Sequence, residues 1–314
     1  MSFWQKALFK SAALMKAVIT LLLFVCSEYA VLFVFEYLGI DKAIYRGTFN
    51  FLTCGIVFGT MFLINKLFSN KNEKLIHVKK LGPDQVAALV IIGLGMLGMV
   101  SIYLGIVEWI AESRQSVNDA VEVYRESVDR FSNTPQTVIP VWDSVLYVIT
   151  LSFIVPLTEE MTFRGVVIGH LRRGFGPWIS VLLSAVGFGL LHGLSIHIGY
   201  AFACGLIIAS CYYLTDSLIA SLILHIVFNV FGSGIPTFMS IEYFGIPKKI
   251  TSLLMRSFNT TELLFMPVAV LAFAYLVSVK RKKDKEAKEA ADSAISADKE
   301  KLVISEENGS GVCP

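Results

Sequence analysis

The chain has 314 residues, of which 55% are hydrophobic and only 17% are charged, and its mean hydropathy is +0.65. Because an ordinary soluble domain carries about 25% charged residues, this composition indicates an integral membrane protein. The formal net charge of +2 implies no general attraction to nucleic acid. We therefore expect membrane lipids around the chain and no nucleic-acid partner.

Apolar segments long enough to cross a bilayer recur along the whole sequence. A spanning helix needs about 20 mostly apolar residues, and about eight segments qualify. In chain order they are 16–38, 47–68, 86–107, 141–168, 176–194, 197–214, 217–234 and 261–279. The first resembles a signal peptide, but its apolar run passes Glu28 without a convincing cleavage site, so we predict an uncleaved span. The expected fold is an all-α, polytopic bundle of transmembrane helices.

Basic residues indicate how the spans are oriented. They follow the second, fourth and last predicted spans: Lys66, Lys71, Lys74, Lys79, Lys80, Arg172, Arg173, Lys280, Arg281, Lys282 and Lys283. The positive-inside rule then predicts that both termini are cytoplasmic. The 233–260 loop also carries basic residues and would lie outside, which is a mild departure from the rule. Short loops and the lack of organelle signals favour a bacterial cell membrane.

Two segments outside the spans are rich in charge. In the 108–140 loop, Val117, Val121, Tyr124 and Val128 recur at helical spacing. This spacing predicts a surface amphipathic helix, with a solvated connector as the alternative. The 280–314 tail is rich in Lys, Glu, Ala, Asp and Ser, and we expect it to be disordered or loosely helical.

A cluster of charged residues lies inside the fourth predicted span, where residues 158–164 read Thr-Glu-Glu-Met-Thr-Phe-Arg. Charge is costly there, so the cluster is a candidate functional site. On a helix Glu160 and Arg164 face each other and are expected to pair. Glu159 is rotated by about 100° and lacks that partner, so it can serve as a base. Pro156, one turn earlier, predicts a kink. The alternative is a structural ion pair, with Glu159 facing water at the helix end.

Two further polar pairs occur in the following spans. Phe188 and His192 are four residues apart, and so are His225 and Asn229, which predicts a shared helix face within each pair. Taken alone, His192 could be an interfacial polar residue. The His225–Asn229 pair could simply hold helices together by hydrogen bonds.

Together the three motifs, Glu-Glu-x-x-x-Arg, Phe-x-x-x-His and His-x-x-x-Asn, resemble the pattern of the CPBP family. This family comprises the CAAX proteases and the bacteriocin-processing (Abi) membrane proteins, and it includes Rce1-like prenyl-protein proteases. The resemblance covers about 140–235. It suggests four parts: N-terminal spans and an extracytoplasmic loop (1–140), a CPBP/Abi catalytic core (141–235), a loop and last span (236–279), and the charged tail (280–314).

The resemblance implies catalytic roles for four residues: Glu159, His192, His225 and Asn229. Glu159 and His192 would activate a water, while His225 and Asn229 would stabilise the oxyanion. Glu160, Arg164 and Phe188 would be structural or substrate-orienting. Peptide hydrolysis needs such a base, acid and oxyanion donors, so the chemistry agrees. Counting along the predicted spans sets His192 roughly 10 Å nearer the outer face than Glu159 and His225.

A metal site is the alternative mechanism. Glu159, His192 and His225 could form a zinc site with a water as the fourth ligand. However, the sequence lacks His-Glu-x-x-His, and Asn229 is a poor zinc ligand. The five cysteines form no Cys-x-x-Cys pair, and four lie in apolar segments, so we interpret them as small hydrophobic residues. We expect no cofactor, and favour a glutamate protease over a metalloprotease.

The predicted function is that of an intramembrane endopeptidase acting on a hydrophobic or lipid-anchored peptide or protein. One alternative is a non-catalytic membrane scaffold or regulator, or a bacteriocin self-immunity protein, acting by binding. Another is a transporter that uses the intramembrane charges as an ion path. No paired broken-helix repeat supports the transporter.

Overall fold

The computed structural model describes residues 2–70, 73–132, 138–193 and 195–309, and all regular structure in these ranges is helical. Among these described residues, seven helices are long and apolar enough to cross a membrane, so the chain is an integral multi-pass membrane protein with the predicted all-α architecture. The elements run in the order α1 (Phe3–Tyr37), α2 (Arg46–Phe68), α3 (Pro83–Ala111), α4 (Gln115–Ser132), α5 (Val141–Ile149), η1 (Thr150–Ile154), α6 (Val155–Glu160), η2 (Met161–Val167), α7 (Ile168–Gly174), α8 (Pro177–Leu190), α9 (Ser195–Thr215), α10 (Leu218–Asn229), η3 (Val230–Gly234), α11 (Ile235–Met239), η4 (Glu242–Phe244) and α12 (Lys248–Gly309).

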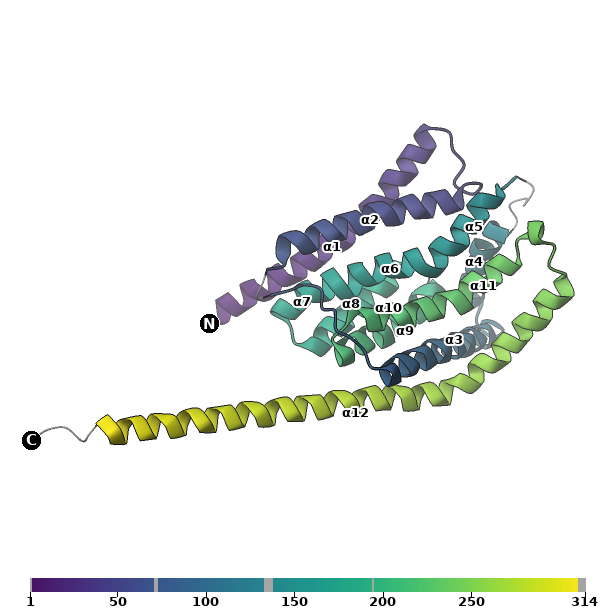
Figure 1. Ribbon diagram of the computed structural model, residues 1–314. Coiled ribbons are helices and arrows are strands. Elements are labelled where there is room, and N and C mark those ends of the chain that lie inside the picture. The colour runs from purple at the N-terminus through teal and green to yellow at the C-terminus, as the bar shows by residue number, and fades with distance from the viewer. Residues whose placement is uncertain (1, 71–72, 133–137, 194, 310–314) are drawn as a thin grey trace, which may run out of the picture.

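One of the predicted spans, 176–194, contains a helix that is shorter than a membrane-spanning helix. The segment 176–194 contains only α8, whose 14 residues rise about 21 Å, less than the ~30 Å hydrocarbon layer. Helix α8 nevertheless runs back across the bundle between α7 and α9 (Figure 1). Accordingly, α1 begins and α12 ends on the same side of the bundle.

Both charged segments outside the predicted spans are helical. In α4 the Val121 side chain is buried, and the Tyr124 ring lies 6.4 Å from the His197 ring of α9. The amphipathic face of α4 therefore packs on the bundle itself, although the side chain of Val128 lies outside the described part. The predicted tail continues α12 as a helix to Gly309.

Close helix contacts determine how the N-terminal spans meet the core. A Cβ on Gly98 of α3 would lie 2.6 Å from the Glu262 carbonyl oxygen of α12, so only glycine permits this approach.

The start of α2 is held by the buried Asp143 of α5. Its carboxylate accepts hydrogen bonds from the backbone N–H groups of Gly47 (2.7 Å) and Thr48 (2.8 Å). A carboxylate at a helix N-terminus is stabilised by unpaired N–H groups and the helix dipole.

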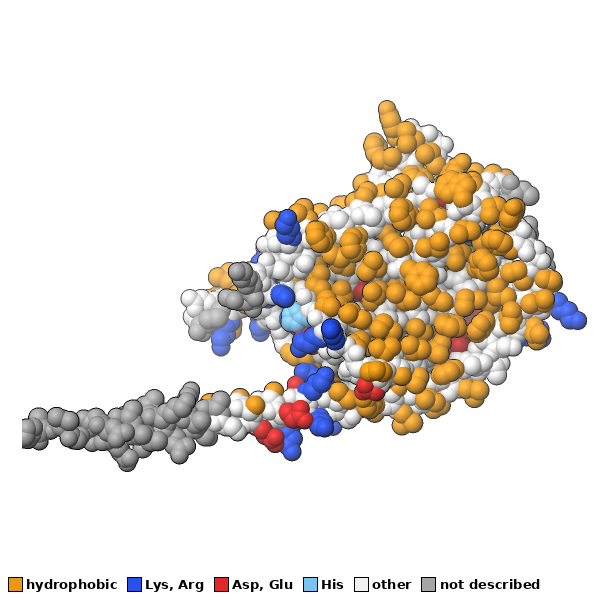
Figure 2. All heavy atoms as spheres, viewed as in Figure 1, with side chains coloured by type: hydrophobic (Ala, Val, Ile, Leu, Met, Phe, Trp, Pro, Cys, Tyr) orange, Lys and Arg blue, Asp and Glu red, His pale blue; other side chains and the backbone are white. Residues whose placement is uncertain are grey.

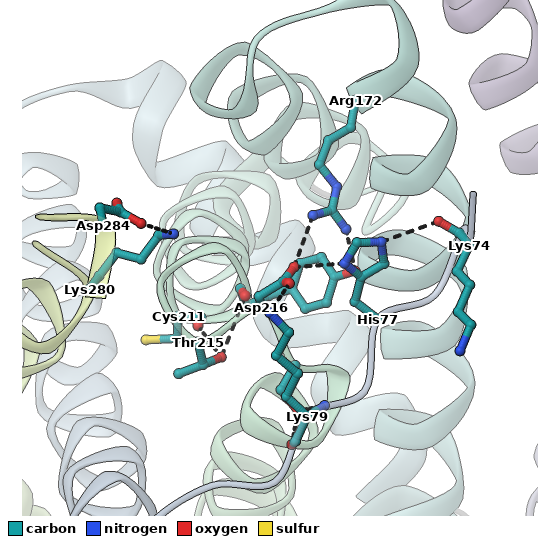
Figure 3. Close-up of polar contacts among 11 residues, drawn as sticks. Lys74, His77, Lys79, Arg172, Cys211, Thr215, Asp216, Lys280 and Asp284 are labelled. Carbon is teal, nitrogen blue, oxygen red and sulfur yellow. Dashed lines mark hydrogen bonds and ion pairs between the residues drawn. The ribbon is translucent and has the colours of Figure 1, made fainter. Parts of the chain in front are cut away.

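Figure 2 shows Lys and Arg side chains gathered at the end of the bundle where α1 begins, beside a flank that is mostly hydrophobic. At this end, hydrogen bonds and ion pairs link the connection between α2 and α3 to the turn between α9 and α10 (Figure 3). The Asp216 carboxylate accepts from His77 Nδ1 (2.8 Å), Lys79 Nζ (2.8 Å) and Arg172 Nη1 (3.3 Å). Ser217 adds two hydrogen bonds to the backbone of Lys79.

The environment of Asp216 favours its charged form. Burial alone would raise the pKa of this carboxyl group, but the hydrogen bond from Lys79 and the charges of His77 and Lys79 outweigh it and lower the pKa. Its backbone φ of +52° lies in the left-handed region, which Asp and Asn tolerate better than most residues. Asp216→Asn therefore removes the charge with little change in backbone strain.

We predict that Asp216→Asn lowers the free energy of unfolding by about 1–2 kcal/mol at neutral pH, because Lys79 and Arg172 lose the negative charge that they pair with. Since the folded pKa is lowered, this stabilisation is complete above the ordinary carboxyl pKa of about 3.9 and is lost as pH falls through the folded value. Thermal unfolding in detergent across pH 3–7 measures the effect. Asp284→Asn, which removes an exposed pair with Lys280, is the control and is expected to be near neutral. Equal effects of the two substitutions would contradict the prediction.

Candidate active site

A cavity of about 200 Å³ lies between the N-terminal helices and the helix that carries the Glu-Glu pair. Helices α1, α2 and α6, η2 and the turn after α8 contribute its lining: Phe24, Glu28, Phe49, Asn50, Thr53, Cys54, Val57, Val155, Thr158, Glu159, Phe163, Leu191 and His192. Of the four predicted catalytic residues, Glu159 and His192 are in this lining. The cavity therefore joins the first and second sequence motifs.

Beneath the cavity wall lies a fully buried ion pair. Glu160 and Arg164 are both 0% exposed, and Arg164 Nη1 donates to Glu160 Oε1 at 2.8 Å. Arg164 Nη2 donates to the Gly205 carbonyl of α9 at 3.0 Å, and its guanidinium lies 4.7 Å from the Phe188 ring centroid. The structure thus forms the predicted pair and gives Phe188 a cation–π contact with it.

His225 lies between the two glutamates. Its Nδ1 is 2.7 Å from Glu160 Oε1, and its Nε2 is 3.6 Å from Glu159 Oε2. Because Glu160 is paired with Arg164 and accepts hydrogen bonds, Nδ1 must carry the proton. Nε2 then faces the Glu159 carboxylate. Arg164 pairs with Glu160 and not with Glu159, whose side chain is 17% exposed and faces His225 of α10.

His192 is held by the end of α8 rather than within a helix. It lies two residues beyond α8, next to Gly193, whose φ is +77°. Its Nδ1 is 2.7 Å from the Phe188 carbonyl oxygen; a carbonyl can only accept, so Nδ1 carries a proton, and in the neutral imidazole the lone pair is on Nε2. The His197 ring, at 4.6 Å, packs against it. Counting along the predicted spans set His192 roughly 10 Å nearer the outer face than Glu159. The two residues nevertheless line the same cavity.

Asn229 donates a hydrogen bond to a backbone carbonyl that Pro156 leaves without a backbone donor. In η1 the Val155 N–H bonds to the Thr150 carbonyl, five residues back. In the same π register, the Leu151 carbonyl would pair with residue 156, but proline has no N–H. Asn229 Nδ2 supplies the missing donor at 2.9 Å. The span consequently continues from Val141 to Gly174, with π-helical segments on both sides of the Glu-Glu pair.

Comparison with known proteins agrees with the three motifs. The family model described as "Type II CAAX prenyl endopeptidase Rce1-like" matches residues 141–231, the segment that carries all of them. Through this segment, the chain is similar to the Rce1-like family.

A curated relative, "Putative membrane peptidase YdiL" of Bacillus subtilis (strain 168), is 28% identical over 124 residues. These residues are 39% of this chain and 51% of that relative. The chain thus spans about half the length of the relative that it matches. No solved structure matches the chain significantly.

Half of the cavity wall comes from outside the Rce1-like core. Glu28 of α1 and Asn50, Thr53 and Cys54 of α2 line the cavity, whereas the sequence motifs pointed only to the C-terminal half. A carboxylate inside an apolar span was a signal that could have singled out Glu28. The three α2 residues carry no comparable signal, because small polar residues are common in membrane helices.

Within the described ranges, no three or more His, Cys, Asp or Glu side chains are grouped in a way that could hold a metal ion. Of the proposed zinc ligands, His225 contacts both glutamates, and His192 is bonded to the α8 backbone through Nδ1. The zinc alternative and the metal-independent mechanism both stay predictions. Cys54, Cys204 and Cys211 are buried free thiols, and Cys26 is an exposed one.

We predict that Arg164→Met destabilises the protein by about 3–5 kcal/mol, because it leaves the Glu160 carboxylate buried beside His225 without its main counter-charge. The matched control is Arg125→Met, which removes an exposed pair with Glu108 and is expected to cost less than about 1 kcal/mol. Thermal unfolding and the yield of monodisperse protein in detergent compare the two. An Arg164 variant as stable as the Arg125 variant would contradict the burial argument.

We also predict that Asn229→Ala costs about 1–3 kcal/mol by leaving the Leu151 carbonyl unpaired. In a Pro156→Ala background the backbone N–H of residue 156 can serve that carbonyl, so the cost of Asn229→Ala should fall by about 1 kcal/mol. A double-mutant cycle on unfolding free energy measures this coupling. Additive effects of the two substitutions would show that Asn229 does not compensate for the proline.

Proposed function

We propose that the chain is an intramembrane endopeptidase of glutamate type, cleaving a peptide bond in a hydrophobic or lipid-anchored substrate. The observation that carries the proposal is the cavity, which brings together Glu159 and His192 from two separate motifs. A carboxylate and an imidazole in one small, mostly apolar space are the groups that water activation requires. The similarity of residues 141–231 to the Rce1-like family supports the same reaction class.

In the proposed reaction, the Glu159 carboxylate takes a proton from a water in the cavity. The resulting hydroxide attacks the scissile carbonyl carbon, and the carbonyl oxygen becomes an oxyanion. Collapse of this intermediate breaks the C–N bond, and the proton passes to the leaving amine. His192, with its Nε2 lone pair available, can orient the water and relay that proton.

His225 and Asn229 remain the proposed oxyanion donors. His225 can donate from Nε2 when it is doubly protonated, a form that the adjacent Glu160 carboxylate supports by accepting from Nδ1. Asn229 keeps one N–H after its bond to Leu151. Because neither residue is in the cavity lining, the proposal requires the substrate carbonyl to reach past Glu159 toward His225.

The surroundings favour an apolar substrate. Six hydrophobic residues line the cavity: Phe24, Phe49, Val57, Val155, Phe163 and Leu191. A cavity lined by membrane-spanning helices suits a hydrophobic or lipidated peptide, which we propose as the substrate class. We propose a bacterial cell membrane as the location, with both termini cytoplasmic, because the basic residues gather at the end where α1 begins and α12 leaves the bundle.

We predict that the purified protein cleaves members of a library of lipidated and hydrophobic peptides, read by mass spectrometry. Glu159→Gln and His192→Gln are each expected to lower the rate by about 10²–10⁴-fold, as for loss of a general base or acid. Glu108→Gln, an exposed glutamate outside the cavity, is the control. If Glu159→Gln protein folds normally and still supports the cellular function of the protein, the binding scaffold or self-immunity alternative is favoured instead.

The same assay separates the two mechanisms. We predict that chelators leave activity unchanged and that the active protein contains less than one zinc per chain by elemental analysis. One bound zinc per chain, together with loss of activity on chelation and recovery on zinc addition, would establish the metalloprotease mechanism.

A further inference from the structure

Glu28 is an unexpected charge on the cavity wall. Helix α1 contains two acidic residues, Glu28 and Glu36, but only Glu28 lines the cavity with Glu159 and His192. A carboxylate that faced lipid at this position would be costly. Glu28 is exposed and contributes to the cavity lining, so its carboxylate is not enclosed in the apolar core of the bundle.

The cavity has an acidic bias. Its lining residues include two carboxylates, Glu28 and Glu159, and one imidazole, His192, but no lysine or arginine. The nearby Arg164 is fully buried and already bonded to Glu160 and Gly205. A substrate cation entering the cavity would therefore meet carboxylates with no competing basic side chain in the lining.

The size of the cavity limits how far Glu28 is from the reaction. If it were round, a cavity of about 200 Å³ would be roughly 7 Å across, the length of about two residues of extended chain. Glu28 and the proposed base Glu159 line this same space. Because Glu28 and Glu159 line one cavity, we assign a group held by Glu28 to the scissile residues or their immediate neighbours.

Two further polar groups lie on the same wall. Thr53 Oγ1 is buried without a hydrogen-bond partner in the described structure, and Asn50 lies one turn earlier on α2. Unpaired buried hydroxyls are uncommon in folded proteins. A bound ammonium or guanidinium group carries several N–H donors, and Thr53 would accept from one of them only if its side chain turned toward the cavity, because Oγ1 is enclosed by protein atoms.

We propose that Glu28 determines substrate specificity by binding a cationic group, either a lysine or arginine side chain or a free amine, within about two residues of the cleaved bond. This inference rests on the proposed peptidase function for its biological meaning. The substrate class narrows from any hydrophobic peptide to a hydrophobic peptide with a positive charge beside the scissile bond.

The test measures binding as well as cleavage, so that it does not depend on turnover. The probes are two acetylated apolar octapeptides that differ only in a central lysine or norleucine. Dissociation constants are measured by fluorescence anisotropy in detergent with full-length Glu159→Gln protein and with the Glu28→Gln/Glu159→Gln double variant. The matched control is Glu36→Gln/Glu159→Gln, because Glu36 lies on α1 outside the cavity lining.

We expect Glu159→Gln protein to bind the lysine peptide about tenfold more tightly than the norleucine peptide, from one charge-assisted contact. Glu28→Gln should abolish this preference while leaving norleucine binding unchanged, and Glu36→Gln should leave the preference intact. Glu28→Lys should reverse the preference toward a peptide with a central glutamate. The inference is overturned if Glu28→Gln retains the lysine preference, if it weakens both peptides equally, or if Glu36→Gln has the same effect.

Cleavage is then measured with Glu159 intact. If the peptides bind with the expected preference but are not cut, the peptidase proposal fails while the cation site stands. If both peptides are cut at equal rates and bound equally, the cation site fails while the peptidase proposal stands.

Discussion

The arrangement of the site depends on one buried interaction, the ion pair between Glu160 and Arg164. Both side chains are fully enclosed, and charges in such a place are tolerated only when each is paired and hydrogen-bonded. Glu160 also receives His225 from α10, and Arg164 reaches the Gly205 carbonyl of α9. Three helices are thereby joined through two side chains. A Cβ on Gly205 would lie 2.9 Å from Phe188 Cδ1, so this residue allows α8 and α9 to close around the pair.

This network places Glu159 at the cavity. Because Glu160 is directed inward to its partners, its neighbour along the helix lies on a different face, where it meets the cavity and His225 Nε2. The adjacent glutamates therefore have distinct environments: one is paired in the dry core, and the other is partly accessible. Such a separation of two like groups is how a protein assigns them different chemical roles.

The backbone around the Glu-Glu pair departs from α-helical geometry for an identifiable reason. Segments η1 and η3 each end two residues before a proline, at Pro156 and Pro236, and they pack against each other, with Gly234 next to Ser152. In the wider π-helical turn, the Val155 N–H bonds to the Thr150 carbonyl. The Leu151 carbonyl, which Pro156 cannot serve, accepts from Asn229 Nδ2 instead. The helix is locally wider on both sides of the Glu-Glu pair, and the kink expected at Pro156 stays a prediction.

The membrane fold and the candidate residues could be predicted from sequence because both depend on local signals. Apolar runs predict spans, and rare polar residues at four-residue spacing within those runs pointed to Glu159, Glu160, Arg164, His192, His225 and Asn229. What sequence could not predict was which partner each would find. His225 lies between two glutamates, Asn229 serves a carbonyl on another helix, and Glu28 joins the cavity from the opposite end of the chain. These contacts link residues far apart in the chain, and only tertiary packing decides them, since spacing along one helix says nothing about which face of a distant helix it meets.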